Sequence, residues 1–154
     1  MFYEDFQVGR VTEIGTAAFT REGIRAYAEQ YDPRVLEADH AGKELFAPGL
    51  LIASECMRRF VDWHAAFCAV AAERGEARPS LGVSPGLRDL RWRPVRPGDV
   101  VTVSMRTISM RLTSKPRWGL VGNTFTGRDQ RGDEALSFSS LVFAFRRSAE
   151  TTGE

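Results

Sequence analysis

Apolar residues recur at spacings of three and four along one long segment, which begins just after Pro48 and Gly49 and extends to about Arg74. This spacing places them on one broad face of a helix. The positions concerned are Ala53, Cys56, Met57, Phe60, Val61, His64, Phe67, Cys68 and Ala71. Since charged residues occupy the opposite side, the pattern predicts a long, well-buried helix that is the most apolar element of the chain.

The segment before this helix shows a different pattern. Thr20 is expected to cap a shorter helix that ends near Tyr31, because its hydroxyl can accept an early backbone N–H and Pro33 disfavours helical backbone just before it. The next segment is expected to be a loop over residues 32–47, with a short turn of helix around residues 36–41.

Alternating apolar and polar residues predict five strands. They are expected at residues 11–19, 87–95, 100–112, 118–126 and 136–145. Pro97 and Gly98 are typical of a tight turn before the third strand. The alternation changes phase near Arg106–Thr107 and again at Ser139–Ser140, and each change predicts a β-bulge.

One strand, a helical section and then four antiparallel strands make an α+β pattern. At 154 residues the chain has the length of one domain, and neither a linker nor a repeat divides it. We therefore expect a single α+β domain over residues 2–147, in which a curved antiparallel sheet wraps around the long central helix. Residues 148–154 are polar and rich in small residues, and we expect them to form a disordered tail.

Composition and charge narrow the classes of partner. The formal net charge is +1, and no stretch concentrates Lys and Arg enough to suggest nucleic-acid binding. Arg91, Arg93 and Arg96 alternate with other residues, as on the solvent face of a strand. The longest apolar run, residues 65–72, is too short to span a membrane. Neither nucleic acid nor a membrane is therefore expected as a partner.

The cysteines and histidines indicate structural roles. Cys56 and Cys68 lie twelve residues apart in the predicted helix, about 18 Å, which is too far for a disulfide. We interpret them as reduced core residues, which indicates a cytoplasmic protein. His40 and His64 are too few and too badly spaced for a metal site, so no metal is expected. His64 is expected in the core or at an interface.

One segment carries residues that could perform chemistry, while the common nucleotide-binding, serine-hydrolase and zinc-protease motifs are absent. Asp32 follows the first helix, and Pro33 stiffens the connection after it. The long helix begins a few residues later, and the unpaired N–H groups of its first turn suit a carbonyl that gains negative charge. A carboxylate here could activate a water molecule beside a thioester. Equally, Asp32 could be structural, as a cap or in an Asx turn.

The chain resembles the MaoC-like acyl dehydratases, and in particular the (R)-specific enoyl-CoA hydratases, over nearly its whole length. The resemblance rests on the order and spacing of short motifs: Y-E-D-F-Q-V-G at residues 3–9, the helix capped by Thr20, Y-D-P at 31–33, G-L-L-I-A-S at 49–54, L-R-D-L-R-W at 87–92 and P-V-R-P-G-D at 94–99. It implies a hotdog fold, homodimers or higher homo-oligomers, an acyl thioester of CoA or of acyl carrier protein as substrate, and no cofactor.

The resemblance also implies roles for individual residues. In that family an Asp and a His five residues later hold the water that adds to a trans-2-enoyl thioester, and a backbone N–H near the start of the central helix, commonly of Gly, polarises the thioester carbonyl. Asp32 matches the family Asp, whereas Glu37 stands at the His position and Glu55 at the Gly position. Together with Gly49 and Ser54, Glu55 is expected to contact the substrate. Two neighbouring carboxylates repel each other, so one has to take a proton, whereas an imidazole exchanges a proton near neutral pH.

Three functions are consistent with these residues. The first is an acyl-thioester hydratase or dehydratase, with Asp32 as base and Glu37 as its partner in a pair that shares one proton. The second is a non-catalytic acyl-thioester-binding protein or inactive partner subunit, which both substitutions favour. The third is a hotdog acyl-CoA thioesterase, in which Glu55 attacks the thioester or activates water.

Overall fold

The computed structural model describes residues 1–76 and 81–147, and the tail expected at residues 148–154 lies outside the described residues. The elements follow in this order: η1 (Tyr3–Asp5), β1 (Val11–Ala18), α1 (Arg21–Tyr31), α2 (Arg34–His40), α3 (Gly49–Glu73), β2 (Gly86–Trp92), β3 (Val100–Leu112), β4 (Trp118–Arg128) and β5 (Glu134–Phe145). The strands therefore end within a few residues of the limits that the sequence predicts.

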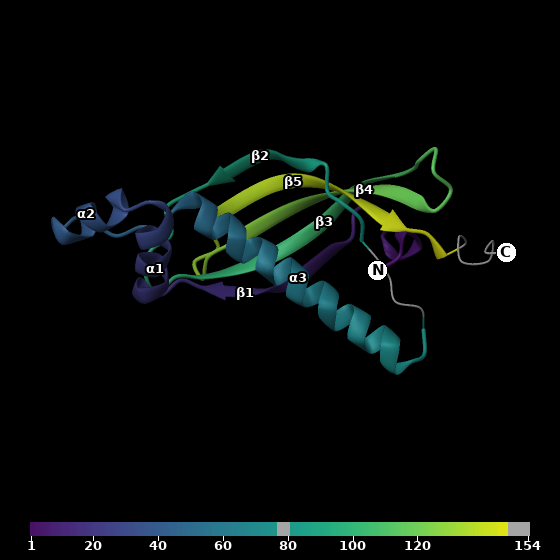
Figure 1. Ribbon diagram of the computed structural model, residues 1–154, viewed down its shortest axis with the longest axis horizontal. Helices are drawn as coiled ribbons and strands as arrows, with labels where there is room; N and C mark the ends of the chain where they lie inside the picture. The colour runs from purple at the N-terminus through teal and green to yellow at the C-terminus, as the bar shows by residue number, and fades with distance from the viewer. Residues whose placement is uncertain (77–80, 148–154) are drawn as a thin grey trace.

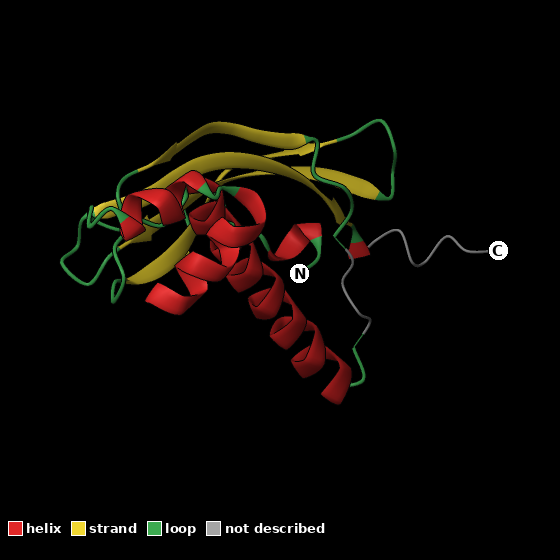
Figure 2. Cartoon of the chain, turned by 60° about the vertical axis from the view of Figure 1, so that its left-hand side comes forward, coloured by secondary structure: helices red, strands yellow, loops and turns green. Residues whose placement is uncertain are grey.

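The five strands form one antiparallel sheet in the order β1-β3-β4-β5-β2. The sheet is curved, with α3 across its concave side and α1 and α2 together near one end (Figure 1). The C-terminal part of α3 points away from the sheet (Figure 2). The expected α+β architecture, a curved antiparallel sheet around a long helix, is confirmed.

Thr20 and Pro33 set the starts of the first two helices. The Thr20 hydroxyl accepts a hydrogen bond from an early backbone N–H of α1 at 3.0 Å, as expected. The Pro33 carbonyl accepts hydrogen bonds from the N–H groups of Leu36 and Glu37 at 3.0 and 3.2 Å. The helix α2 is therefore longer than the short turn expected at residues 36–41, because the Pro33 φ of −61° is already that of a helix.

The helix α3 has the expected limits but buries only part of its apolar face. Ile52 is almost fully buried, and Phe60 packs edge-on against Phe125 of β4 with ring centroids 5.5 Å apart. Met57 and Val61, expected on the same buried face, are 40% and 53% exposed. The prediction of a well-buried helix is wrong at these two positions, because the sheet covers one side of α3 and no second layer of the described chain covers the other.

The strand registers confirm one of the two predicted bulges. β3 pairs with β4 through an irregularity between Thr107 and Ser109, next to the predicted position. The bulge predicted at Ser139–Ser140 is wrong, since β5 pairs with β4 without interruption there. The irregularity lies instead in β2, opposite that part of β5. Ser140 faces the concave side, as its buried apolar neighbours in the strand do. Because a polar residue occupies this inward position, the sequence pattern only looked like a change of phase.

Cys56 and His64 lie on the sheet side of α3. Cys56 is buried, and burial raises the pKa of its thiol to about 12, which is consistent with a reduced core residue. His64 is half-buried, with its ring 6.4 Å from that of Phe60 and its nitrogens 3.8 Å from the Cys68 sulfur. Neither α3 nor another described helix is long and apolar enough to cross a membrane.

Asp99 joins the turn before β3 to the hairpin between β4 and β5. Its buried carboxylate accepts hydrogen bonds from the Arg96 N–H at 2.8 Å, from the Gln130 side chain at 3.0 Å and from Arg131 at 3.1 Å. Burial acts to raise the pKa of Asp99, but these hydrogen bonds and the charge of Arg131 outweigh it and hold the pKa below its ordinary value. The ionised form of Asp99 therefore stabilises the fold.

We expect Asp99→Asn to lower the free energy of unfolding at pH 7 by about 1–3 kcal/mol. The substitution replaces the charge-assisted hydrogen bonds of a buried carboxylate with the weaker hydrogen bonds of a neutral amide. Since the folded-state pKa is lowered, this contribution is present at neutral pH and is lost as the pH falls below the ordinary carboxyl range. Urea unfolding followed by circular dichroism, at pH 7 and near pH 3, measures both effects. The difference between wild type and variant should shrink at the lower pH.

The matched control is Asp133→Asn, which removes an exposed carboxylate 3.9 Å from the same Arg131 side chain. It should change the free energy of unfolding by less than about 0.5 kcal/mol. Equal losses in the two variants would contradict the role given to Asp99.

Candidate functional site

Asp32 lies at the junction of α1 and α2, where the backbone is held on both sides. Its N–H donates to the Ala28 carbonyl at 2.9 Å, and its carbonyl accepts a hydrogen bond from the Val35 N–H at 3.1 Å. Pro33 stiffens the junction, as the sequence predicts. The Asp32 side chain is 29% exposed, so its carboxylate can reach a ligand.

The helix α2 is tied to α1 by charged side chains. Asp39 accepts a hydrogen bond from Arg21 at 2.8 Å and lies 3.5 Å from Arg25 Nε. His40 Nε2 lies 3.1 Å from Arg25 Nη2. These contacts hold α2, and with it Glu37, in a defined orientation relative to Asp32.

A third residue, Arg34, belongs to this site and was missed by the sequence analysis. Its Nε and Nη2 donate to the two carboxylate oxygens of Asp32 at 2.8 and 3.2 Å. This side-chain hydrogen bonding holds the pKa of Asp32 below its ordinary value, against a smaller opposing effect of desolvation. A hydrogen bond from the Arg34 backbone N–H also lowers the pKa of Asp32. This is the contact that defines the Asx turn considered for Asp32. The signal in the sequence is the arginine two residues after the aspartate.

Glu37 lies exposed on α2, near Arg34. The hydrogen bond to Asp32 and, to a smaller extent, the charge of Glu37 raise the pKa of the Arg34 guanidinium. Among the described side chains, none donates a hydrogen bond to the Glu37 carboxylate. The structure thus adds a guanidinium beside Asp32, and the charge of Glu37 acts on the same guanidinium.

The start of α3 packs under Trp92 of β2. A Cβ on Gly49 would overlap the indole ring, so the absence of a side chain is what allows this contact. The Pro48 carbonyl accepts two N–H groups of the first turn. Within the described chain the N–H groups of Gly49 and Leu50 have no such partner, and they are the donors available to a carbonyl at this end.

Ser54 and Glu55 lie further along α3, and their polar groups are already engaged. Ser54 Oγ donates to the Leu50 carbonyl at 2.7 Å, and the Glu55 carboxylate lies 3.4 Å from Arg59 Nη2. As the seventh residue of α3, Glu55 has its N–H within the hydrogen-bond ladder of the helix. The geometry therefore favours the first-turn N–H groups over that of Glu55 as donors to a thioester carbonyl.

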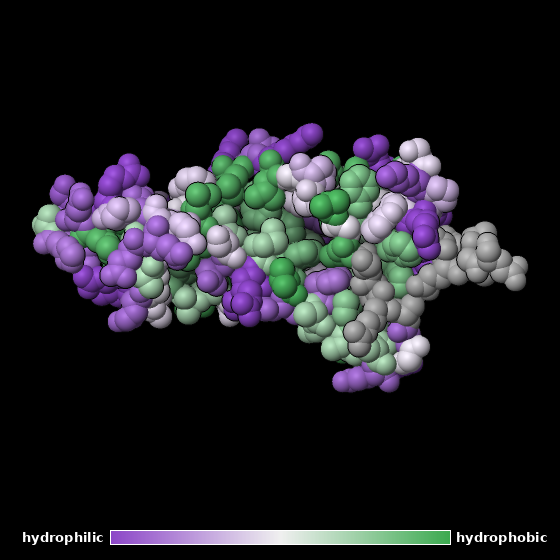
Figure 3. Space-filling model, viewed as in Figure 1, coloured by the Kyte–Doolittle hydropathy of each residue, from purple (hydrophilic) through white to green (hydrophobic). Residues whose placement is uncertain are grey.

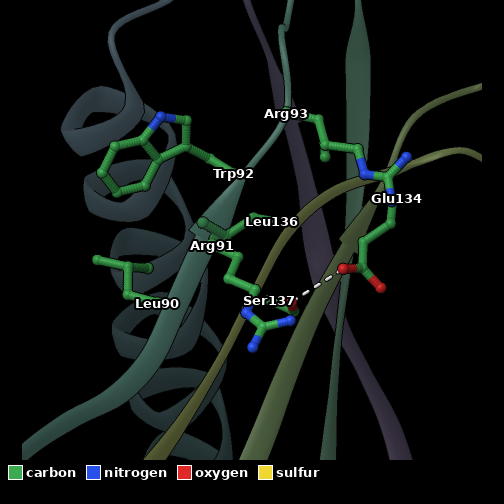
Figure 4. Close-up of a pocket in the computed structure, with 8 residues that line it drawn as sticks. Leu90, Arg91, Trp92, Arg93, Glu134, Leu136 and Ser137 are labelled. Atoms are coloured by element: carbon green, nitrogen blue, oxygen red, sulfur yellow. Dashed lines mark hydrogen bonds between the residues drawn. The ribbon is translucent and has the colours of Figure 1, made fainter.

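A surface hollow of about 460 Å³ adjoins Trp92 and is lined by residues 90–93 and 134–137. Leu90 and Trp92 extend from β2 toward α3, whereas Arg91 extends to the opposite side (Figure 4). Asp32 and Glu37 line neither this hollow nor a larger one of about 660 Å³ beside β3 and β4. In the single chain these two carboxylates stand at the open surface.

Within residues 1–76 and 81–147, no group of three or more His, Cys, Asp or Glu side chains is placed to hold a metal ion.

Comparison with known proteins gives matches of structure only. No family model matches the chain, and no curated protein matches its sequence. A MaoC-like dehydratase from Rhodospirillum rubrum has a similar structure, with a TM-score of 0.75 and 24% identity over 96% of this chain and 98% of that one. The (R)-hydratase PhaJ1 from Pseudomonas aeruginosa has a TM-score of 0.60 and 19% identity over 95% and 86% of the two chains. A Mycobacterium tuberculosis protein with a double hotdog fold has a TM-score of 0.65 and 18% identity over 95% and 44%.

These similarities establish the fold of the chain. The hotdog fold implied by the sequence resemblance is confirmed, with nearly the whole chain superposed on each of the three structures. The roles assigned to Asp32, Glu37, Gly49, Ser54 and Glu55 remain predictions.

We expect Arg34→Gln to raise the pKa of Asp32, because the substitution removes the charge-assisted hydrogen bonds that favour the ionised carboxylate. Carbon-detected NMR of the Asp32 carboxyl during a pH titration measures this. Arg58→Gln is the matched control, since it removes an exposed pair with Asp62 on α3 and should leave the Asp32 titration unchanged. An identical Asp32 titration in wild type and Arg34→Gln would show that the pairing has no electrostatic consequence.

Proposed function

We propose that this chain is an acyl-thioester hydratase or dehydratase of the MaoC type, a hydro-lyase that acts on a 2-enoyl or 3-hydroxyacyl thioester of CoA or of acyl carrier protein. The fold supports this proposal, because proteins of the same fold include a MaoC-like dehydratase and an (R)-hydratase. The observation that carries it is the position of Asp32, a partly exposed carboxylate on a stiff junction with Glu37 on the adjoining helix.

In the proposed hydration, water adds across the C2–C3 double bond of the enoyl thioester. The water oxygen bonds to C3 of the enoyl thioester while Asp32 takes a proton from the water, and C2 gains a proton from Glu37. Arg34 favours the ionised form of Asp32, which is the form that can take a proton from water. The N–H groups at the start of α3 stabilise the negative charge that develops on the thioester oxygen. Transfer of a proton from Asp32 to Glu37 restores the resting state, and dehydration reverses these steps.

A second function, a non-catalytic binding protein or inactive partner subunit, is favoured by one observation. Both oxygens of Asp32 accept hydrogen bonds from Arg34, which makes this carboxylate a weaker base than an unpaired one. Such a chain would bind an acyl thioester without turnover. The thioesterase alternative depends on Glu55, whose carboxylate is paired with Arg59.

Hydration is measured as the loss of enoyl absorbance of crotonyl-CoA and of longer 2-enoyl-CoA substrates, while a thiol reagent detects CoA released by thioester hydrolysis. We expect Asp32→Asn to lower the hydration rate about 10²- to 10⁴-fold, the usual effect of losing a general base. Glu37→Gln should cause a comparable loss, because it keeps the shape of the side chain and removes its proton. Glu37→His should be no faster than wild type if Glu37 is a working acid.

The control for these variants is Asp62→Asn, which removes an exposed carboxylate on α3 and should leave the rate unchanged. Equal, measurable rates in wild type and Glu37→Gln would exclude Glu37 from the reaction. An inactive wild type together with an active Glu37→His variant would identify the second function. Release of CoA without prior loss of enoyl absorbance would indicate thioester hydrolysis instead.

The chain leaves apolar surface uncovered, and we propose that a second copy covers it. β2 is an edge strand that pairs on one side only, with β5. Its Leu87 and Trp92 are 44% and 49% exposed, and Met57 and Val61 of α3 are exposed as well. Apolar side chains gather along the middle of the molecule, over α3 and the neighbouring sheet (Figure 3). An unpaired edge next to apolar surface favours association.

We expect a homodimer or a higher homo-oligomer in solution. Sedimentation velocity at micromolar concentration should give at least twice the chain mass of 17.2 kDa. Leu87→Lys places a charge on the β2 edge and should weaken association without changing the circular dichroism spectrum. Val8→Lys changes another exposed apolar residue, which lies outside β2, and serves as the control. A wild type that sediments as a stable monomer would refute this prediction.

A further inference from the structure

The outer, convex face of the sheet carries hydroxyl groups in cross-strand rows. Ser104, Thr126 and Ser137 lie opposite one another on β3, β4 and β5, and Thr124 lies opposite Ser139 in the next row. The hydroxyl oxygens of Thr124 and Ser139 are 3.5 Å apart. The alternate residues of these strands face the core. The rows therefore form a continuous outward surface of hydrogen-bonding groups.

Arginines flank these rows on both sides. On β2, Arg88 and Arg91 lie opposite the two β5 serines, with the β2 irregularity between them. On β3, Arg106 lies opposite Thr124, and Arg128 ends β4. Arg91 extends from the side of β2 that is turned away from α3 (Figure 4). One row therefore begins and ends with a guanidinium group.

We call this surface the hydroxyl–arginine face. It consists of Arg88, Arg91, Ser104, Arg106, Thr124, Thr126, Arg128, Ser137 and Ser139. Within the described chain, none of its four arginines forms an ion pair with a carboxylate.

The four arginines of the face outnumber the nearby carboxylates that have no arginine partner, which are Glu13, Asp89 and Glu134. Glu134 accepts a hydrogen bond from Ser137 at 2.9 Å, and Asp129 is paired with Arg131. Glu13 lies opposite Ser104 on β1, outside the arginines.

We propose that the hydroxyl–arginine face is a docking surface for an acidic helix of another protein. Guanidinium and hydroxyl groups are hydrogen-bond donors suited to carboxylates. Arg106 on β3 and Arg88 on β2 are three strand spacings apart, about 14 Å. A helix about 10–12 Å wide fits between them, above the hydroxyl rows. Carboxylates on its two flanks reach the arginines on either side.

The shape and chemistry of the face favour this partner over nucleic acid or an anionic membrane. The face contains no aromatic ring on which bases could stack. Its outward curvature, with no helix of the described chain covering it, suits a narrow partner better than a flat membrane (Figure 2). A hollow of about 630 Å³, lined in part by Arg106, Arg128 and neighbouring hydroxyl groups, offers a recess for side chains of the partner. This inference is independent of the proposed function.

The test uses the whole chain and two alanine-rich helical peptides, one with Glu on both flanks of one helix face and one with Gln at the same positions. Fluorescence anisotropy measures affinity, and NMR amide shifts locate the binding surface. We expect the Glu peptide to bind and to shift amides of β3, β4 and β5. The triple variant Arg88→Gln/Arg91→Gln/Arg106→Gln should weaken binding about tenfold. High salt should have a similar effect, because exposed charges are screened.

The matched control, Lys43→Gln/Arg74→Gln/Lys115→Gln, removes three exposed cations elsewhere and should bind as wild type does. Any one of three results would overturn the proposal. These are equal affinity for both peptides, an equal loss of affinity in this control variant, and NMR amide shifts confined to the helices. Tighter binding at this face by duplex DNA or anionic lipid vesicles would overturn it too. If circular dichroism shows that the triple variant is unfolded, the single variants Arg88→Gln and Arg106→Gln replace it. Each should weaken binding about two- to threefold. Unchanged binding in both would overturn the proposal.

Discussion

Three aromatic rings connect α3 to the concave side of the sheet. Phe60 of α3 meets Phe125 of β4 edge-on, and Phe125 stacks on Phe138 of β5 with ring centroids 4.8 Å apart. Buried aromatic pairs of this kind combine a large apolar area with a preferred geometry, so they hold α3 at a defined place on the sheet. The start of α3 has a contact of its own, with Trp92 of β2 over Gly49. The N–H groups assigned to the thioester oxygen therefore depend on this packing.

The strand β2 shows how one element serves two surfaces. Its inward residue Trp92 covers the start of α3, while the outward Arg91 belongs to the hydroxyl–arginine face. The irregularity in β2 adjusts this alternation, and it brings Arg88 and Arg91 opposite the two outward serines of β5. A change in β2 would therefore affect the proposed docking surface, the proposed dimer edge and the helix start together.

At the candidate site, the charged neighbour of Asp32 matters as much as Asp32 itself. An imidazole next to Asp32 would supply a group that titrates near neutral pH, whereas Arg34 is permanently charged. Arg34 favours the ionised form of Asp32. Under the proposed function, the strength of Asp32 as a base depends on this one electrostatic interaction.

Local patterns in the sequence were enough to determine most of the secondary structure. The three- and four-residue spacing after Gly49 predicted α3, and the Thr20 hydroxyl predicted the start of α1, because both depend on residues close together in the chain. The resemblance in motif order led to the hotdog fold and to Asp32. By contrast, the polar Ser140 at an inward position produced a false bulge, because a residue type alone does not show which face it occupies.

Only the tertiary structure decided which predicted features meet. The exposure of Met57 and Val61 depends on how much of α3 the sheet covers, and the sheet is built from strands distant in the sequence. The pairing of Arg34 with Asp32 depends on the bend between α1 and α2. The arginines that flank the outer hydroxyl rows come from β2, β3 and β4, and only the order and register of those strands bring them to one face. The sequence by itself therefore determined the elements and the residue types, while burial and charge neighbours were set by long-range packing.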